Sequence, residues 1–96
     1  MADRKREVSF PLGRVVATPG ALRALEETGQ QAVDFLDRHA CGNWGVVEEE
    51  DWWQNDNAVR YGGRLLSSYR LASGEKIWII TEADRSATTL LLPDEY

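Results

Sequence analysis

The chain has 96 residues, which is close to the commonest size of a single domain and leaves no room for a second independent core. Its 43% hydrophobic and 28% charged residues are ordinary for a globular protein and exclude the composition typical of disorder. The formal net charge of −5 gives no overall attraction to phosphate backbones or anionic lipid, so nucleic-acid binding is not expected.

The numbers of cysteine and histidine residues and the lengths of the apolar runs exclude further classes of protein. One Cys and one His exclude an internal disulfide and a structural zinc site, and no metal or cofactor is expected. No apolar run approaches the roughly 20 residues of a membrane span. The first ten residues are charged where a signal peptide needs an apolar segment. The expected location is the cytoplasm, with no membrane contact.

Residues 1–12 are expected to form a flexible N-terminal tail, and residues 13–96 a single α+β domain. The tail contains a concentration of basic side chains, Arg4-Lys5-Arg6. A solvated, frayed terminus explains these charges, and a nucleic-acid-binding arm is the alternative.

The first part of the domain has the pattern of one strand followed by three helices. Gly13–Ala17 is short and β-branched, which is typical of a strand. Thr18, followed by proline, is an N-cap that begins a first helix. Apolar residues at helical spacing predict a second helix over Gln30–Ala40. Acidic residues at Glu48–Asp51 favour the start of a third helix, and the pair Gly62-Gly63 ends it.

The pattern then changes to a period of two, which is typical of strands. Three β-prone runs are separated by short connections: Leu65–Leu71, Lys76–Thr81 and Ser86–Leu92. Short connections predict an antiparallel meander. The expected order is therefore β-α-α-α-β-β-β, an α+β fold with an antiparallel sheet packed on helices.

His39 has the one side chain whose unperturbed pKa lies near neutrality. Near the end of the second helix, an imidazolium would complement the negative end of the helix dipole. A general acid or base is the alternative, but no nucleophile or carboxylate stands at a known spacing from it. Cys41 is close in sequence, and a small buried thiol accounts for it. No catalytic residue is assigned.

Aromatic and polar side chains are interleaved between Trp44 and Asn57. Asp51 and Asn55 share a helix face, so they either clamp a ligand or bond to each other and to nearby backbone. Trp52 and Trp53 point about 100° apart on a helix, so both cannot be fully buried in one face. Trp is enriched at binding hot spots. The candidate binding residues here are Trp44, Asp51, Trp53 and Asn55.

The hairpin expected around residues 81–89 has no glycine in its turn. It must therefore fold through side-chain bonds of Asp84 and Ser86 to the backbone. Glu82 and Arg85 are not explained by that need, and they form either a surface ion pair or a recognition element. Glu82, Asp84 and Arg85 complete the candidate binding residues.

Several linear motifs carry a resemblance: Gly42-Asn43-Trp44-Gly45, the Asp51–Asn55 spacing, Gly63–Tyr69, Trp78–Ser86, and the ending Leu92–Tyr96. Over about Gly13 to Tyr96 the chain resembles a family of small bacterial proteins carried on plasmids, integrative elements and prophages. The resemblance brings no activity and no catalytic residues. It implies an accessory protein of mobile DNA that binds a host or rival machine.

Two functions follow as hypotheses. The first is a non-enzymatic protein-interaction module, such as an inhibitor of a host defence system, acting through Trp44–Asn57 and the hairpin around Asp84. Its partner is a protein, with a second copy of this chain as one option. The alternative is a ribonuclease similar to the RelE-type toxins, in which His39, Arg64 and Arg85 supply the acid and phosphate-binding groups. A net charge of −5 disfavours RNA binding.

Overall fold

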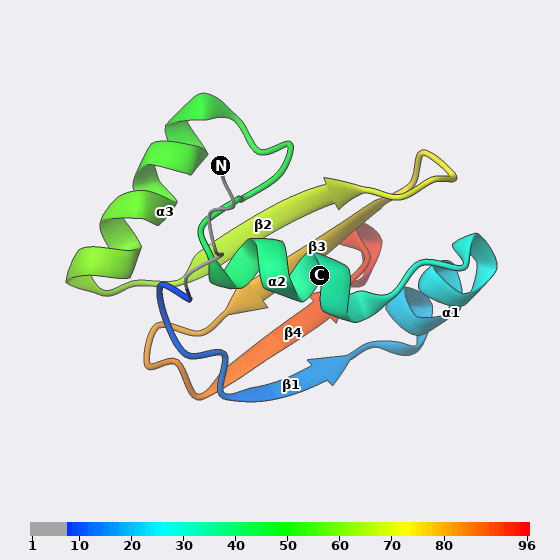
Figure 1. The fold of residues 1–96 in the computed structure, drawn as a ribbon, viewed down its shortest axis with the longest axis horizontal. Coiled ribbons are helices and arrows are strands. Elements are labelled where there is room, and N and C mark those ends of the chain that lie inside the picture. Colours follow the sequence, from blue (N-terminus) through cyan, green and yellow to red (C-terminus); the bar gives the residue numbers. More distant parts are fainter. Residues whose placement is uncertain (1–7) are drawn as a thin grey trace, which may run out of the picture.

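The computed structural model describes residues 8–96, and Figure 1 shows how their helices and strands are arranged. The strands are β1 (Arg14–Ala17), β2 (Leu65–Arg70), β3 (Lys76–Thr81) and β4 (Ala87–Leu91). The helices are α1 (Pro19–Thr28), α2 (Ala32–Ala40), α3 (Glu49–Tyr61) and the short 3₁₀ turn η1 (Pro93–Glu95). The order β-α-α-α-β-β-β confirms the expected α+β fold.

The strands form one sheet in the order β1-β4-β3-β2. β2, β3 and β4 are the expected antiparallel meander. β1 pairs with β4 in parallel, so the sheet is mixed rather than antiparallel throughout. The chain reaches β4 from β1 only after three helices and two strands, and no local pattern in β1 indicates so distant a neighbour.

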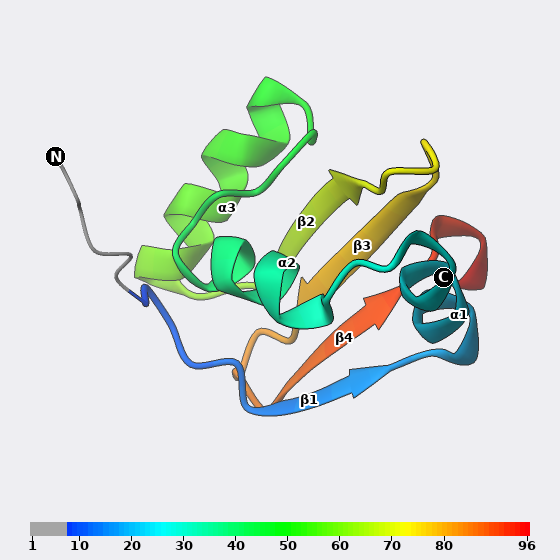
Figure 2. The same ribbon diagram turned by 45° about the vertical axis from the view of Figure 1, so that its right-hand side comes forward.

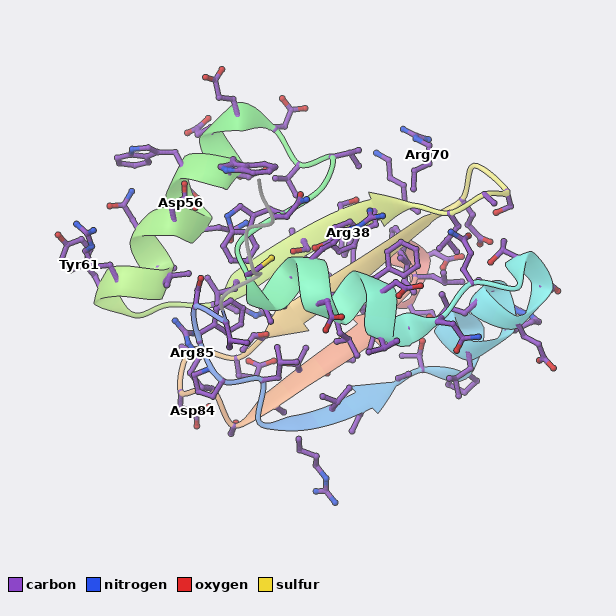
Figure 3. The ribbon with its side chains drawn as sticks, viewed as in Figure 1. Arg38, Asp56, Tyr61, Arg70, Asp84 and Arg85 are labelled. Carbon is purple, nitrogen blue, oxygen red and sulfur yellow. The ribbon has the colours of Figure 1, made fainter. Side chains whose placement is uncertain are left out.

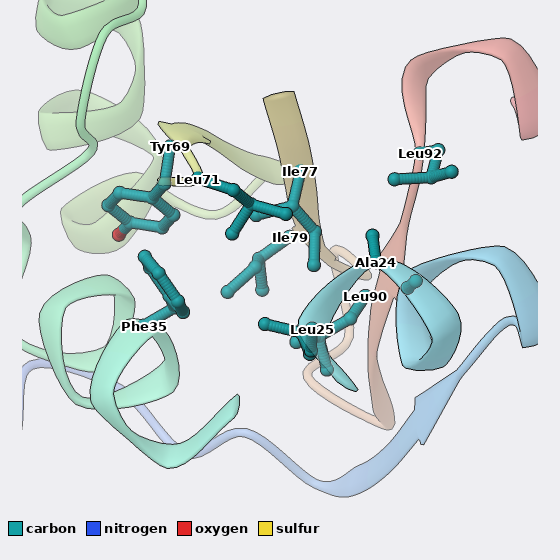
Figure 4. Close-up of a cluster of buried hydrophobic side chains, with 10 residues drawn as sticks. Ala24, Leu25, Phe35, Tyr69, Leu71, Ile77, Ile79, Leu90 and Leu92 are labelled. Carbon is teal, nitrogen blue, oxygen red and sulfur yellow. The ribbon is translucent and has the colours of Figure 1, made fainter. Parts of the chain in front are cut away.

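α1 and α2 pack on one face of the sheet, where their apolar side chains build the larger core cluster (Figure 4). Alternate residues of each strand point to this face. The cluster consists of Ala21, Ala24, Leu25, Phe35, Tyr69, Leu71, Ile77, Ile79, Leu90 and Leu92. The opposite face, called the second face below, therefore carries Leu66, Trp78 and Ile80.

α3 lies beside β2, at the other end of the molecule from α1 (Figure 2). Its inward side packs on a smaller cluster of Phe10, Trp44 and Leu65. Trp52 and Val59 of the helix contact this cluster, while Trp53 remains in solvent. The expectation that both tryptophans cannot be buried together is confirmed.

The folded part of the chain begins earlier than residue 13. Phe10 is only 5% exposed and stacks on Trp44 with ring centroids 6.0 Å apart. The backbone N–H of Ser9 donates to the carbonyl of Ala40 at 2.8 Å. Burying a Phe side chain is worth about 1.5–3 kcal/mol, which favours ordering this segment. The expected tail of residues 1–12 is thus wrong for residues 9–12, and Arg4-Lys5-Arg6 lies outside the described residues.

The chain end is joined to the start of α1. Glu95 accepts hydrogen bonds from the Thr18 hydroxyl at 2.5 Å, from Leu92 N–H at 2.8 Å and from Gly20 N–H at 3.1 Å. Thr18 in turn accepts from Ala21 N–H, which confirms it as the N-cap. These bonds, the Thr18 bond first, hold the pKa of Glu95 below its usual range. They also place Tyr96 on the second face.

Candidate functional site

A groove of about 470 Å³ lies between α3 and the second face of the sheet. Its lining residues are Asp51, Gln54, Asn55, Ala58, Arg64, Leu66, Trp78, Ile80 and Tyr96. The four helical residues are spaced i, i+3, i+4 and i+7, so they form one stripe along α3. The groove thus has a helical wall that faces the second face of the sheet.

The floor and the far wall of the groove are apolar and aromatic. Leu66 and Ile80 lie directly opposite each other in the β2–β3 register. Trp78 comes next on the same face of β3, and its ring meets that of Tyr96 edge-on at 5.7 Å. Trp78 and Leu66 remain partly exposed. Part of this apolar surface is therefore available to another molecule.

Arg64 supplies a positive charge at the end of the groove where α3 finishes. Its Nη1 donates to the Tyr96 hydroxyl at 2.9 Å, and its Nε lies 3.9 Å from Glu82 Oε1. Both side chains of this ion pair are about half exposed, at 49% and 48%. A long, solvated pair contributes little energy. The guanidinium therefore keeps N–H groups with which it can bind an anionic group.

Asn55 has a structural role. Its side-chain amide donates to the carbonyl of Leu66 at 2.8 Å and accepts from Leu66 N–H at 3.1 Å. The amide thus bonds to the edge of β2 as a neighbouring strand would, and it fixes the position of α3 along the strand. The Asp51 carboxylate forms no hydrogen bond or ion pair with any of residues 8–96, so the two side chains have separate roles.

Trp44 is completely buried, at 0% exposure, and this corrects its assignment as a binding residue. Its Nε1–H donates to Asp56 Oδ1 at 3.0 Å. The Trp44–Val46 segment also pairs with the backbone of Ser68, and Gly45 permits this at a φ of 82°. A Cβ at Gly45 would collide with the Ser68 carbonyl. The Gly42–Gly45 motif therefore attaches this loop to the edge of β2.

Trp53 is 66% exposed, but it lies on the outer side of α3 and does not line the groove. Residues 51 and 53 point about 200° apart around the helix, so they lie on nearly opposite sides of it. The structure therefore does not bring Trp53 together with Asp51.

Arg85 acts as a structural clamp at the hairpin that joins β3 and β4 (Figure 3). Its guanidinium donates to the carbonyls of Gly63 at 2.6 Å and Ala58 at 2.9 Å, and to two carbonyls of its own turn. Neither expected role, an ion pair with Glu82 or recognition of a partner, describes it. Its φ of 62° is unusual for a residue with a side chain, and these bonds hold it there.

The remaining hairpin residues behave differently from one another. Asp84 Oδ1 accepts from Ser86 N–H at 3.0 Å, which confirms the expected turn role. Hydrogen bonds from Ser86 hold the pKa of Asp84 below its usual range. Glu82 contacts Arg64, a residue that lines the groove, through a long ion pair. None of the three hairpin candidates, Glu82, Asp84 and Arg85, lines the groove.

His39 is buried at 0% exposure, and burial together with the charge of Arg85 lowers its pKa to about 4. The imidazole is therefore neutral at pH 7, and the expected imidazolium at the helix end is wrong. Cys41 is not its partner, because the Cys41 thiol donates to the Arg38 carbonyl at 3.4 Å. Enclosure of His39 also removes it from contact with any substrate.

A chain of buried hydrogen bonds determines the tautomer of His39. The Thr88 hydroxyl donates to the Leu12 carbonyl at 2.7 Å, so Thr81 must donate to Thr88 at 2.7 Å. His39 Nε2–H then donates to Thr81 at 2.8 Å, and Nδ1 accepts from the Ser67 hydroxyl at 2.6 Å. Each hydroxyl uses its single proton once. This network joins α2, three strands and the segment before β1.

The groups expected for a RelE-type ribonuclease do not form one site. His39 is buried on the face of the sheet that α1 and α2 cover. Arg85 donates its hydrogen bonds to backbone carbonyls, and Arg64 lines the groove on the other face. Within the part of the chain that the structure describes, no three His, Cys, Asp or Glu side chains gather as a metal site. No helix in that part is long and apolar enough to cross a membrane.

Comparison with models of protein families, with curated proteins and with solved structures gives no match. The resemblance to proteins of plasmids, integrative elements and prophages stays a prediction. Seven residues from its motifs line the groove: Asp51, Asn55, Arg64, Leu66, Trp78, Ile80 and Tyr96. Sequence reasoning did not place Trp78 and Tyr96 in a site. The alternation along β3 puts Trp78 on the same face as Ile80, but Tyr96 reaches the groove through a distant contact of Glu95.

Proposed function

We propose that the chain is a non-enzymatic protein-binding module whose binding site is the groove. One observation carries the proposal: a partly exposed apolar floor, an aromatic wall and charged groups at both ends of α3 occur in a single depression. Aromatic residues and arginine are the types that contribute most to binding at protein interfaces. On the resemblance to mobile-element proteins, the proposed partner is a host or rival protein, such as a component of a defence system.

The positions of the groups with shifted pKa support a binding role over catalysis. Catalytic acids and bases usually have strongly shifted pKa values and face a cleft. Here burial lowers the pKa of His39 to about 4 and raises that of Tyr69 to about 12, and both residues are buried outside the groove. Tyr69 donates to the Asn43 carbonyl at 2.5 Å. Both shifts thus belong to groups that hold the fold together.

Site-specific photo-crosslinking in cells tests the proposal. A benzophenone amino acid replaces Gln54 in the groove or, as a control, the exposed Leu22 on α1. We expect one defined protein to be captured from the Gln54 position and not from Leu22. Equal capture from both positions would contradict the assignment of the groove.

A matched pair of variants then tests the captured protein in purified form. Gln54→Trp fills the groove, whereas Asn57→Trp adds the same bulk on α3 outside the groove lining. We expect Gln54→Trp to weaken binding at least about tenfold, or about 1.4 kcal/mol, with Asn57→Trp near wild type. Circular dichroism confirms that both are folded. Equal affinities for the two variants would refute the groove as the binding site.

A further inference from the structure

The charges along the groove have a fixed direction. Asp51 lies in the first turn of α3, and Arg64 follows the other end of the helix through Gly62 and Gly63. Ala58, which lines the groove near the Arg64 end, is seven residues after Asp51, or about 10 Å along the helix axis. The groove is therefore negative at one end and positive at the other.

Only part of this charge has a structural explanation. Acidic residues in the first turn, including Glu49 and Glu50, are favoured by the positive end of the helix dipole. Asp51 shares that position, but its carboxylate also lines the groove and bonds to none of residues 8–96. Arg64 has one ionic contact, at 3.9 Å. Each end of the groove can therefore accept an opposite charge from a ligand.

We propose that the groove takes an extended peptide segment in which a basic and an acidic residue flank a large apolar residue. The inference rests on the function proposed above and names the partner's chemistry. Extended chain advances about 3.3 Å per residue and alternate side chains share a face, so two charges four residues apart lie about 13 Å from each other on one face, with an apolar side chain midway between them. The basic side chain lies at Asp51 and the acidic side chain at Arg64.

The apolar residue lies on the floor between the two charges. Leu66 and Trp78 expose apolar surface there, and the edge-on pair of Trp78 and Tyr96 presents ring faces and edges on one wall. An aromatic or long aliphatic side chain gains from burial against such a wall. A volume of about 470 Å³ accommodates that side chain together with the ends of its charged neighbours.

A nucleic-acid strand fits this groove less well. A strand carries a negative charge at each nucleotide, whereas one end of the groove holds Asp51 beside Glu49 and Glu50. A basic groove that tracks the backbone is the usual requirement for binding a single strand. The opposite charges at the two ends of the groove instead match a peptide that carries one basic and one acidic residue.

Selection from a phage-displayed library of random twelve-residue peptides tests this inference on three proteins: wild type, Arg64→Glu and Arg64→Gln. Wild type is expected to enrich sequences with a basic and an acidic residue four positions apart and an apolar residue midway between them. On Arg64→Glu, the enriched peptides are expected to carry a second basic residue at the position where peptides selected on wild type carry an acidic one. Arg64→Gln is expected to lose the acidic preference and keep the basic one. Circular dichroism and urea unfolding confirm that each variant is folded.

The outcomes separate the inference from the proposed function. Enriched peptides that lack the charge pattern, or keep it unchanged on Arg64→Glu, would overturn the inference and leave a protein-binding groove. Failure to enrich any peptide, together with equal photo-capture from Gln54 and Leu22, would overturn both. Binding of single-stranded RNA oligonucleotides that is lost on Arg64→Gln would also overturn the peptide inference. Self-association lost in Gln54→Trp would identify a second copy as the occupant instead.

Discussion

The two faces of the sheet use polar side chains in opposite ways. Under the helices, His39 and three strand hydroxyls are enclosed, and each is hydrogen-bonded. On the second face, Asp51 and Arg64 are exposed and make few bonds within residues 8–96. Burying a polar group destabilises the folded state unless the group is hydrogen-bonded, whereas a solvated group without a protein partner costs little because water bonds to it. The comparison separates groups that stabilise the fold from groups available for binding.

Replacing His39 should have the largest effect on stability. His39→Leu leaves the buried Ser67 hydroxyl without an acceptor and removes the N–H that Thr81 accepts, although Thr81 still donates to Thr88. The unsatisfied Ser67 hydroxyl costs about 1–3 kcal/mol and the lost bond to Thr81 about 1 kcal/mol more, so we expect a loss of about 3 kcal/mol in the free energy of unfolding. Urea denaturation followed by circular dichroism measures it. A loss below about 1 kcal/mol would show that the network does not hold the fold together.

The lowered pKa of His39 also predicts how the free energy of unfolding changes with pH. The folded pKa of about 4 lies below the ordinary value of 6.5, so the unfolded chain binds the proton more readily. Stability should be complete above about pH 6.5 and fall steadily towards pH 4, by about 3 kcal/mol at most. Urea unfolding between pH 4 and 8 checks this.

His39→Gln, which does not titrate, is the control for this pH series and should give a nearly flat profile above pH 5. Asp84 and Glu95 have lowered pKa values, so their contributions are present above the ordinary carboxyl range and lost below it. They act at the acid end of the series. A wild-type profile that is also flat between pH 5 and 6.5 would contradict a neutral, buried His39.

Arg85 sharpens the comparison, because it is a charged side chain that serves the fold. Arg85→Ala removes the bonds to the carbonyls of Ala58 and Gly63, and we expect a cost of about 2 kcal/mol. Arg85→Gly removes the same bonds but relieves the φ of 62°, so it should be about 1 kcal/mol more stable than Arg85→Ala. Thermal and urea unfolding of the pair measure both effects. Equal stability of the two variants would exclude backbone strain at this residue.

The fold could be predicted from the sequence because its signals are local. Thr18 as an N-cap, the acidic start of α3 and the alternation along β2 each indicate an element from a few neighbouring residues. The parallel pairing of β1 with β4 could not be predicted, since it joins segments about 70 residues apart. Burial of Phe10 also depends on distant partners, including Trp44.

The site was predicted only in part for the same reason. Helical spacing places Asp51 and Asn55 on one face, but only the position of the Leu66 backbone decides that Asn55 is structural. Trp44 and Arg85 have the residue types of an interface, and tertiary contacts enclose one and engage the other. Residue type alone does not separate a buried anchor from an exposed one.

Substitutions in the groove should have the smallest effect on stability and the largest effect on binding. Asp51→Asn and Arg64→Gln change exposed side chains, so each is expected to shift the free energy of unfolding by less than about 0.5 kcal/mol. If the groove binds a peptide of mixed charge, each variant should bind that peptide at least about tenfold more weakly, as measured by a fluorescence polarisation titration. His39→Gln, once circular dichroism confirms that it is folded at pH 7, should leave the affinity unchanged, because the His39 network lies under the opposite face of the sheet. Affinity lost through His39 and retained in the groove variants would reverse the assignment of the two faces.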